Sequence, residues 1–315
     1  MAAPPRVIPV PCPFGLTGGL IWVYYIDAPE PAIVDTGVAA SPVAVIEPGL
    51  AKAGIKLSDV KWILASHGHW DHIGGAQTAK DHAAPDVKIA MHSADRELLA
   101  NRRAHIAGYA GARFRFIDAP ELLAAHDAML MENLSAELAA DRPLTDGDRI
   151  NLGGGVTVSV VHTPGHSPGA VAFVLDGTDW AFTGDSIQVG GAGGFPLIER
   201  PADYRKSVRR VLEDVRPKRL FMGHQFSDHR FSKANNGTLS AQLEGDAVAS
   251  ALRASLEVEA ALADAAKLLD PAGDRPGNAA MFAAAAESLG FDPSDPINWP
   301  GSLFHTLSGY IRGLG

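Results

Sequence analysis

The chain has 315 residues, 46% of them hydrophobic, with a formal net charge of −9 and one cysteine, Cys12. A chain of this size can bury a large core. Its charge and lack of a basic stripe argue against a nucleic-acid partner, and one cysteine excludes an intramolecular disulfide. No apolar run approaches the ~20 residues of a membrane-spanning helix, and residues 1–6 lack the apolar core of a signal peptide. We therefore expect a cytoplasmic protein with no membrane or nucleic-acid partner.

The first third of the chain alternates strand-like and helix-like segments. Its pattern predicts strands at 20–26, 32–35, 61–65 and 88–91, helices at 43–53 and 93–101, and a further helix starting near Gly75. Such alternation, with antiparallel-looking pieces, suits two stacked sheets covered by helices. We expect a mixed α/β (α+β) fold.

The segment after the strand at 61–65 carries the strongest chemical signal. It runs His67-Gly-His69-Trp-Asp71-His72, so three imidazoles and a carboxylate fall within six positions. His67 and His69 are two residues apart and project to the same side of an extended segment. Asp71 and His72 follow where the chain turns toward a helix, close enough to serve a second ion. Imidazole and carboxylate suit zinc, so the motif predicts a pair of bound transition metals.

Three later strand-like runs each end in a side chain that can bind a metal. The strand-like runs are 156–161, 180–182 and 219–222, and the side chains that follow them are His162, Asp185 and His224. One such residue alone would more often be structural, and Gly-Asp also favours turns. Three of them at strand ends, together with the first motif, favour a shared metal site.

In these motifs the chain resembles the metallo-β-lactamase-fold hydrolases, over roughly residues 5 to 230. The segment Pro31-Ala-Ile-Val-Asp35-Thr-Gly37 looks like the family's early strand with its buried aspartate. The resemblance implies an αββα sandwich with ligands on loops at one edge. Carried over residue by residue, it implies two groups of ligands and a bridge: His67, His69 and His162 for the first metal, Asp71, His72 and His224 for the second, and Asp185 between them.

The implied cofactor is two divalent ions, zinc in first place, with iron and manganese as alternatives. Asp35 is expected to orient ligands, the alternative being a plain turn residue. His166, in a Thr-Pro-Gly-His-Ser-Pro-Gly run, is expected to shape its loop rather than to bind metal. The other histidines are expected to be surface or capping residues: His82, His92, His105, His126, His229 and His305.

Two regions extend the minimal domain. Residues 1–235 are expected to form the catalytic domain, with a helical insertion at about 93–145, and residues 236–315 a C-terminal helical region. The insertion either caps the metal site or packs on the sheet. In relatives such as glyoxalase II a helical tail shapes the substrate pocket. Five C-terminal side chains are candidates for such a wall, with a core role as the alternative: Phe291, Trp299, Leu303, Phe304 and Tyr310.

The implied reaction is hydrolysis of a carboxylic ester, lactone or thioester. A hydroxide that bridges the metals would attack the carbonyl, and the cations would stabilise the oxyanion. Asp71 is the expected catalytic residue, orienting the nucleophile and passing on a proton. The expected partner is a small-molecule substrate with an apolar portion, and oligomer formation is left open.

Departures from known relatives leave the substrate open. Asp185 as a bridge disfavours the β-lactamases proper. Glyoxalase II would place basic residues soon after this aspartate, whereas here Gly190–Phe195 is followed by no lysine or arginine until Arg200. Homoserine-lactone lactonases tend to place a tyrosine there, where this chain has Ile187 and Gln188.

Two hypotheses of other classes remain beside a dinuclear hydrolase or a glyoxalase II-like glutathione thioesterase. A mononuclear iron oxidoreductase of the persulfide dioxygenase type needs only the first ligand group, which would leave His72 and His224 superfluous. A catalytically idle binding protein with the same fold is the other, and the intact ligand set counts against it.

Overall fold

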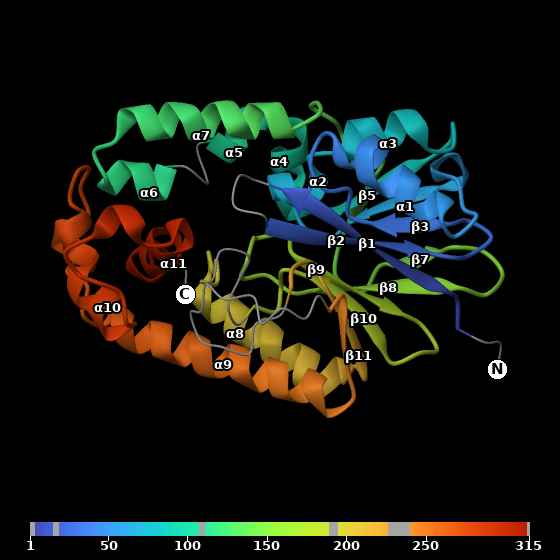
Figure 1. Cartoon of the computed structure of the whole chain (residues 1–315). Helices are drawn as coiled ribbons and strands as arrows, with labels where there is room; N and C mark the ends of the chain where they lie inside the picture. Colours follow the sequence, from blue (N-terminus) through green and yellow to red (C-terminus); the bar gives the residue numbers. More distant parts are fainter. Residues whose placement is uncertain (1–3, 15–18, 107–110, 189–194, 226–239, 314–315) are drawn as a thin grey trace.

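Two six-stranded sheets pack face to face, and helices cover both outer faces of the pair (Figure 1). The computed structural model on which this description rests covers residues 4–14, 19–106, 111–188, 195–225 and 240–313. The predicted αββα sandwich is confirmed. In the part of the chain that the structure describes, no helix combines the length and the apolar character that crossing a bilayer requires.

Each sheet is built from consecutive strands. The first contains, in spatial order, β1 (Val7–Phe14), β2 (Gly19–Ile26), β3 (Ala32–Val34), β4 (Trp62–Ala65), β5 (Lys88–His92) and β6 (Arg142–Leu144). The second contains β12 (Gln242–Glu244), β11 (Arg219–Met222), β10 (Trp180–Gly184), β9 (Val171–Leu175), β8 (Thr157–His162) and β7 (Arg149–Asn151). The strands β3 to β6 run parallel, as do β10 and β11, and the other pairs are antiparallel.

The strands are apolar on both faces because both faces are covered. On β2 the alternate residues Trp22, Tyr24 and Ile26 pack in the layer between the sheets. Val23 and Tyr25 point to the other side, into the core beneath the outer helices. This period of two, apolar in both phases, explains why central strands of the sandwich read as continuous hydrophobic runs.

Short helices cover the outer face of the first sheet. They are η1 (Pro42–Ile46), α1 (Glu47–Ala51), η2 (Leu57–Asp59), α2 (Trp70–Ile73) and α3 (Ala76–His82). Ile46, Leu50 and Ala79 pack there against Val10 and Ile63. The helix expected from Gly75 is therefore preceded by a separate turn, α2, that begins within the histidine motif.

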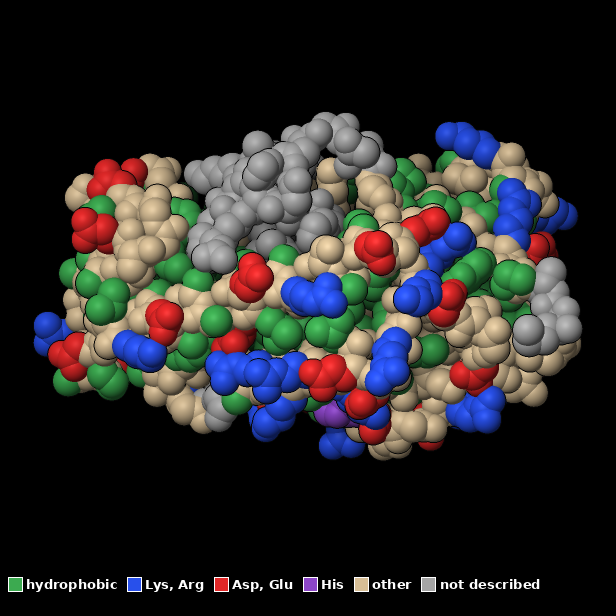
Figure 2. All heavy atoms as spheres, turned by 90° about the horizontal axis from the view of Figure 1, so that it is seen from below, with side chains coloured by type: hydrophobic (Ala, Val, Ile, Leu, Met, Phe, Trp, Pro, Cys, Tyr) green, Lys and Arg blue, Asp and Glu red, His purple; other side chains and the backbone are tan. Residues whose placement is uncertain are grey.

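The outer face of the second sheet is covered by α8 (Pro201–Arg210) with η5 (Val211–Val215), and by α9 (Asp246–Ala266). Val208 of α8 and Leu252 of α9 pack on Leu220 of β11. Basic residues on the outer side of this layer pair with carboxylates, among them Arg205 with Glu259. Figure 2 shows positive and negative side chains intermixed on the face that carries α9, as expected for solvated helix surfaces.

The insertion and the C-terminal helices extend beyond the sandwich on the same side (Figure 1). The insertion consists of η3 (Ser93–Asp95), α4 (Arg96–Ala100), α5 (Arg102–His105), α6 (Gly111–Phe116) and α7 (Pro120–Asn133). After α9 come η6 (Pro271–Gly273), η7 (Ala279–Phe282), α10 (Ala283–Ser288), η8 (Pro296–Asn298) and α11 (Gly301–Ile311). Phe116, Phe282 and Phe304 stack together, so these two regions share a core. The division at residue 235 stays a prediction.

Two strands, β1 and β12, were not predicted from the sequence pattern. β1 carries a proline at every second position, Pro9, Pro11 and Pro13, and proline normally argues against a strand. All three are exposed, and β1 is the edge strand, where a missing donor costs least. β12 occupies residues 242–244, inside the C-terminal region predicted to be helical from residue 236; the helix begins at Asp246.

Candidate metal centre and its pocket

The candidate ligands converge at one edge of the sandwich, just beyond the ends of strands from both sheets. β4 leads into His67, β10 into Asp185 and β11 into His224. Backbone hydrogen bonds tie two of these loops to strands of the opposite sheet, from Val171 N on β9 to Ser66 O at 2.9 Å and from Trp22 N on β2 to Gly223 O at 2.7 Å. Each sheet thus fixes where its loops start, and the opposite sheet helps to hold them in place.

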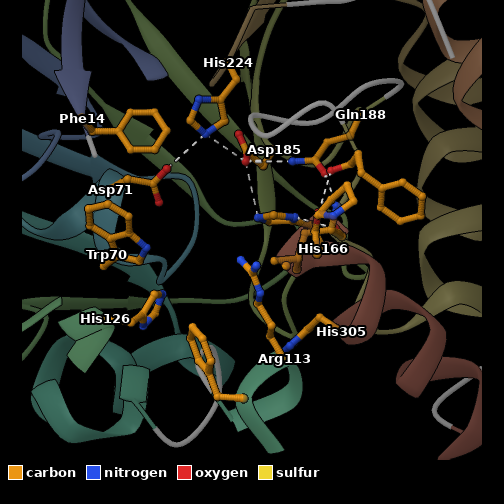
Figure 3. Close-up of a pocket in the computed structure, with 16 residues that line it drawn as sticks. Phe14, Trp70, Asp71, Arg113, His126, His166, Asp185, Gln188, His224 and His305 are labelled. Atoms are coloured by element: carbon orange, nitrogen blue, oxygen red, sulfur yellow. Dashed lines mark hydrogen bonds and ion pairs between the residues drawn. The ribbon is translucent and has the colours of Figure 1, made fainter. Parts of the chain in front are cut away.

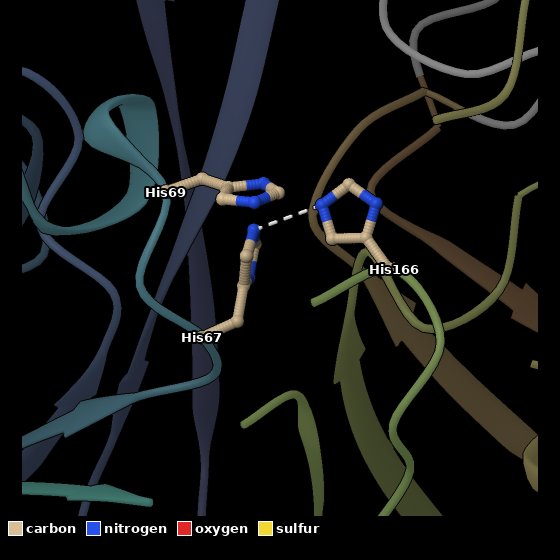
Figure 4. Close-up of side chains that lie close together, drawn as sticks. All are labelled: His67, His69 and His166. Atoms are coloured by element: carbon tan, nitrogen blue, oxygen red, sulfur yellow. Dashed lines mark hydrogen bonds between the residues drawn. The ribbon is translucent and has the colours of Figure 1, made fainter. Parts of the chain in front are cut away.

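The first group of ligand-competent side chains is His67, His69 and His166, all at most 4% exposed (Figure 4). Their ring centroids lie 4.4 to 4.6 Å apart. The Nε2 atoms of His67 and His166 are 3.1 Å apart. Three buried imidazole nitrogens that face one point match the donor set of a zinc or related site.

The second group is Asp71, His72 and His224. Nε2 of His224 lies 3.2 Å from Oδ2 of Asp71 and 3.3 Å from Nε2 of His72. His72 is fully buried, and the other two are less than a tenth exposed. These three residues were expected to bind the second metal, and the structure brings them together.

Asp185 lies between the two groups. Its Oδ2 is 3.2 Å from Nε2 of His224 and 3.5 Å from Nε2 of His166, so one carboxylate reaches both. Its Oδ1 is buried without a hydrogen-bond partner among the described residues and lies 3.4 Å from Nε2 of His72. A Cβ on Gly223 would stand 2.3 Å from that oxygen, so glycine is required there. An orphaned buried carboxylate oxygen amid imidazoles fits bound divalent cations.

His162 lies outside these groups, so the placement of His162 in the first ligand set needs correction in favour of His166. On β8 the side chains of Val158 and Val160 point into the layer between the sheets, and His162 continues that phase. Its ring stacks on His92 at 4.0 Å, and its Nε2 contacts Pro168 O at 2.9 Å. The Pro-Gly turn that follows carries His166 back to the cluster.

Most imidazoles of the cluster are held from behind through Nδ1. His166 contacts Leu197 O at 2.8 Å, His224 contacts Leu20 O at 2.7 Å, and His67 contacts Ser66 Oγ at 3.0 Å. A proton held on Nδ1 leaves the Nε2 lone pair directed inward, which is the arrangement that metal-binding histidines use.

Asp35 performs the orienting role expected of it. Its carboxylate contacts Nδ1 of His72 at 2.8 Å and accepts from Ser66 N and Ser66 Oγ, both at 2.8 Å. The residue is 1% exposed and takes the left-handed backbone conformation, with φ 64°. That conformation is strained for a non-glycine residue, and the structure places it directly behind a ligand.

Asp95 is a second buried carboxylate, and sequence reasoning missed it. It accepts from Gly68 N at 2.8 Å, from Ser167 Oγ at 2.6 Å and from Gly169 N at 2.5 Å. It therefore joins the loop that carries His67 and His69 to the loop that carries His166. Burial raises the pKa of Asp95 against these three hydrogen bonds. No motif marks it, because its partners, two backbone amides and one serine hydroxyl, are far away in the sequence.

Gln188 was noted only as a departure from lactonases, yet it supports the bridging carboxylate. Its Nε2 donates to Oδ2 of Asp185 at 2.8 Å, and its Oε1 accepts from Leu197 N at 2.9 Å. The hydroxyl of the fully buried Tyr204 bonds to the Gln188 backbone at 2.9 Å. A tyrosine at position 188 would lose the amide that orients Asp185.

The first group is electrostatically prepared to bind cations. Burial, reinforced by neighbouring histidines, lowers the pKa of His67 and of His69 well below the usual range. Burial also lowers the pKa of His166. These three imidazoles are therefore neutral at physiological pH and offer their lone pairs without first losing a proton.

The second group is charged instead. Burial acts to lower the pKa of His72, but Asp185 and Asp35 outweigh it and raise that pKa. Asp185 likewise raises the pKa of His224 to about 10 against burial. Burial acts to raise the pKa of Asp185, which His224 and His72 nevertheless hold well below its usual range. Two protons thus occupy positions where divalent cations would bind.

The cluster opens into a pocket of about 260 Å³. Asp71, His166, Asp185 and His224 line its inner end (Figure 3). Its walls come from β1, α2, the insertion, the segment that precedes α8 and the start of α11. The apolar side chains among them are Phe14, Trp70, Phe114, Phe195, Leu197 and Pro300.

Both appended regions contribute to this pocket. Arg113 and His126 come from the insertion, and Ser302 and His305 from α11. The expectation that His126 and His305 are ordinary surface or capping residues is therefore wrong. His92 does cap η3, accepting from Ala94 N. His229 and residues 190–194 of the glycine-rich run lie outside the described residues.

The aromatic C-terminal residues take the alternative, core role. The five proposed wall residues are absent from the described pocket lining. Phe304 and Leu303 are fully buried, and Trp299 packs on Phe304 at 5.5 Å. The pocket lining from this region is formed instead by Pro300, Gly301, Ser302 and His305.

Comparison with known proteins gives one family. A model described as the metallo-beta-lactamase superfamily matches residues 16–224. The cytoplasmic hydroxyacylglutathione hydrolase of Arabidopsis thaliana is 24% identical over 203 residues, covering 62% of this chain and 63% of that protein. A probable metallo-hydrolase of Burkholderia pseudomallei is 28% identical, covering 53% of this chain and 52% of that protein. The chain thus spans between about half and two thirds of these relatives. A hydroxyacylglutathione hydrolase of Rhodobacter capsulatus is 26% identical, covering 76% and 71%.

Solved structures agree on the fold. A metallo-beta-lactamase family protein from Thermus thermophilus aligns over 98% of this chain and 93% of its own, with a TM-score of 0.64 and 21% identity. A subclass B3 metallo-beta-lactamase of Bradyrhizobium japonicum aligns over 78% and 88%, with a TM-score of 0.54 and 22% identity. At these identities the likeness shows the fold alone.

Proposed function

We propose, from the premise that this chain belongs to the metallo-β-lactamase superfamily, that it is a dinuclear metal-dependent hydrolase of a carboxylic ester, lactone or thioester. The observation that carries this proposal is the position of Asp185. One buried carboxylate lies within 3.5 Å of imidazoles from both groups and lines an open pocket. A single-ion site would leave His72 and His224 without a role.

The donor set fits two divalent cations, with zinc the first choice and iron or manganese the alternatives. We assign one ion to His67, His69 and His166, the other to Asp71, His72 and His224, and Asp185 to both. Bound cations would supply a nucleophilic water at neutral pH and Lewis acidity toward a carbonyl.

The protein's own groups would handle the proton. Asp71 lines the pocket, and its Oδ2 lies 3.2 Å from Nε2 of His224. Burial acts to raise the pKa of Asp71, but His72 and His224 lower it, so the carboxylate is ionised and can accept a proton. We assign Asp71 to orient the attacking water, take its proton and pass it to the leaving group.

The pocket wall would select the substrate. Its apolar side chains exclude water and favour a small molecule with an apolar portion. Two of the relatives bear the name hydroxyacylglutathione hydrolase, which favours a thioester within the proposed class. We keep the cytoplasm as the proposed location, in keeping with the single free cysteine, Cys12.

The decisive experiment combines metal analysis with a substrate panel. Purified protein should contain about two divalent ions per chain and should hydrolyse at least one of p-nitrophenyl esters, N-acetylcysteamine thioesters and γ- or δ-lactones. One iron per chain with oxygen consumption on glutathione persulfide would instead identify an iron oxidoreductase. Bound metal without any turnover across the panel would favour a binding protein.

A further inference from the structure

The pocket beside the metal centre holds a cation that hydrolysis itself does not use. Among the described residues that line it, Arg113 is the single lysine or arginine. It lies on α6, and Figure 3 shows its side chain extending from below into the pocket, toward His166 and across the pocket from His224.

The guanidinium of Arg113 is only partly satisfied. Its Nη2 donates to Ile297 O, but its Nε is buried without a hydrogen-bond partner in the described structure. No carboxylate of the described residues forms an ion pair with it, and burial lowers the pKa of Arg113. Its neighbour Arg115, two residues along the same helix, is paired with Asp274 at 3.0 Å. Arg113 is thus a partly buried cation with one unpaired donor and no ion-pair partner among the described residues.

His126 adds a second polar group at the same place. It lies on α7, and its Nδ1 is also buried without a hydrogen-bond partner among the described residues. The centroid of its ring lies 5.6 Å from the centroid of the Phe114 ring. The Arg113 guanidinium lies 5.5 Å from the centroid of the same Phe114 ring. Both groups come from the insertion, face the pocket and are framed by an apolar surface.

The unpaired Nε donor of Arg113 points to an anionic ligand. The chain as a whole carries a net charge of −9, so its general field disfavours anions, and the partly buried Arg113 supplies a local positive charge. A guanidinium matches a carboxylate through paired, charge-assisted hydrogen bonds. Arg113 lies on α6, whereas the metal-ligand end of the pocket is formed by residues that follow β4, β10 and β11.

We propose that Arg113, assisted by His126, binds a carboxylate at the end of the substrate remote from the scissile carbonyl. This rests on the proposed hydrolase function and narrows its substrate class to monoesters or monothioesters of short dicarboxylic acids and lactones of short hydroxydicarboxylic acids. The pocket volume of about 260 Å³ falls just below the usual range for ligand sites, so the acyl part is short.

The test measures binding first, so that it does not depend on turnover. The probes are N-methylglutaramate, which carries a carboxylate, and N-methylglutaramide, in which a carboxamide replaces it. Calorimetry on the metal-loaded protein should show the carboxylate probe binding at least about tenfold more tightly, as expected for hydrogen bonds to a charged group. Equal affinity for the two probes would overturn the proposal.

Variants on one helix separate this role from metal binding and from folding. Arg113→Gln should reduce the preference to about threefold or less, Arg113→Lys should leave an intermediate preference because it keeps the charge and a donor for Ile297 O, and Arg115→Gln should retain the full preference. A full preference in both Arg113 variants would assign the carboxylate to the metals and reject the role of Arg113. Melting temperature and metal content verify that each variant is folded and loaded.

Turnover then separates this inference from the general function. With p-nitrophenyl hemiglutarate, Arg113→Gln should raise KM at least about tenfold, while KM for p-nitrophenyl valerate should stay nearly constant. If no ester or thioester is cleaved but the probes still bind in an Arg113-dependent manner, the hydrolase proposal fails and the carboxylate site stands.

Discussion

The metal centre and the outer wall of its pocket are built in different ways. The ligands follow the ends of strands or lie on loops pinned by buried carboxylates such as Asp35 and Asp95. The wall comes from α6, α7 and α11, which lie beyond the sandwich (Figure 1) and carry Arg113, Phe114 and Ser302. The ligand positions thus depend on sheet geometry, and the wall depends on how two appended regions pack. Reaction chemistry and substrate choice can therefore vary independently in this molecule.

Removal of a metal ligand should have the largest effect, and His166 is the ligand that the sequence pattern left out. His166→Ala should lose metal and lower kcat/KM by on the order of 10³-fold or more, because even orienting partners of ligands are typically worth 10–100-fold. His69→Ala should behave alike. The control is His162→Ala, which removes a similar side chain four residues earlier and should retain metal. Metal analysis and steady-state kinetics decide, and metal loss in His162→Ala alone would restore the original assignment.

The support behind the ligands should matter next. Asp95→Asn removes hydrogen bonds between the two histidine loops, so metal affinity should fall about 10–100-fold and unfolding free energy by about 1–3 kcal/mol. Asp148 offers a matched control, because it also accepts from a backbone amide, Thr145 N, but is only partly buried and lies away from the ligand loops. Asp148→Asn should leave metal affinity unchanged. Chelator competition measures the affinities, and equal effects of both variants would show that Asp95 has no special role.

The charge difference within the cluster gives a pH prediction. His72 and His224 have raised pKa values, about 10 for His224. In the metal-free protein both rings therefore stay protonated at pH values above the ordinary pKa of histidine. Cations bind only the neutral rings, so loading should release about two protons between pH 7 and 9, and apparent affinity should rise with pH across that window. Calorimetry in buffers of different ionisation enthalpy counts the protons. Release of none at pH 8 would contradict the assigned protonation.

The fold and most of the ligands could be predicted because their signals are local. His67, His69, Asp71 and His72 form one motif, and Asp185 and His224 each follow a strand within three residues of its apolar run. His166 was missed because it lies four residues past its strand. Its signal was the run of prolines and glycines around it, which turns the chain back toward the cluster.

Other features could not be predicted because their partners are distant in the sequence. Asp95 bonds to residues 27 and more than 70 positions away, and Gln188 acts on a carboxylate whose own position depends on two sheets. Arg113 and Arg115 lie two residues apart on α6, but Arg113 lines the pocket whereas Arg115 pairs with Asp274. Such distinctions depend on packing between elements, which no single segment encodes.

Substitutions in the pocket wall should have the smallest effect on turnover. Two phenylalanines on α6, Phe114 and Phe116, allow this to be tested. Phe114 lines the pocket, whereas Phe116 is 2% exposed and packs on Phe282 and Phe304. Phe114→Ala should raise KM about threefold to tenfold through lost apolar contact, with metal content and stability nearly unchanged. Phe116→Ala should instead lower unfolding free energy by about 3–5 kcal/mol. Because the two residues are neighbours on α6, a KM change confined to Phe114→Ala would show that the insertion selects substrate by direct contact. Equal KM changes in both variants would show that it acts only through the shared core.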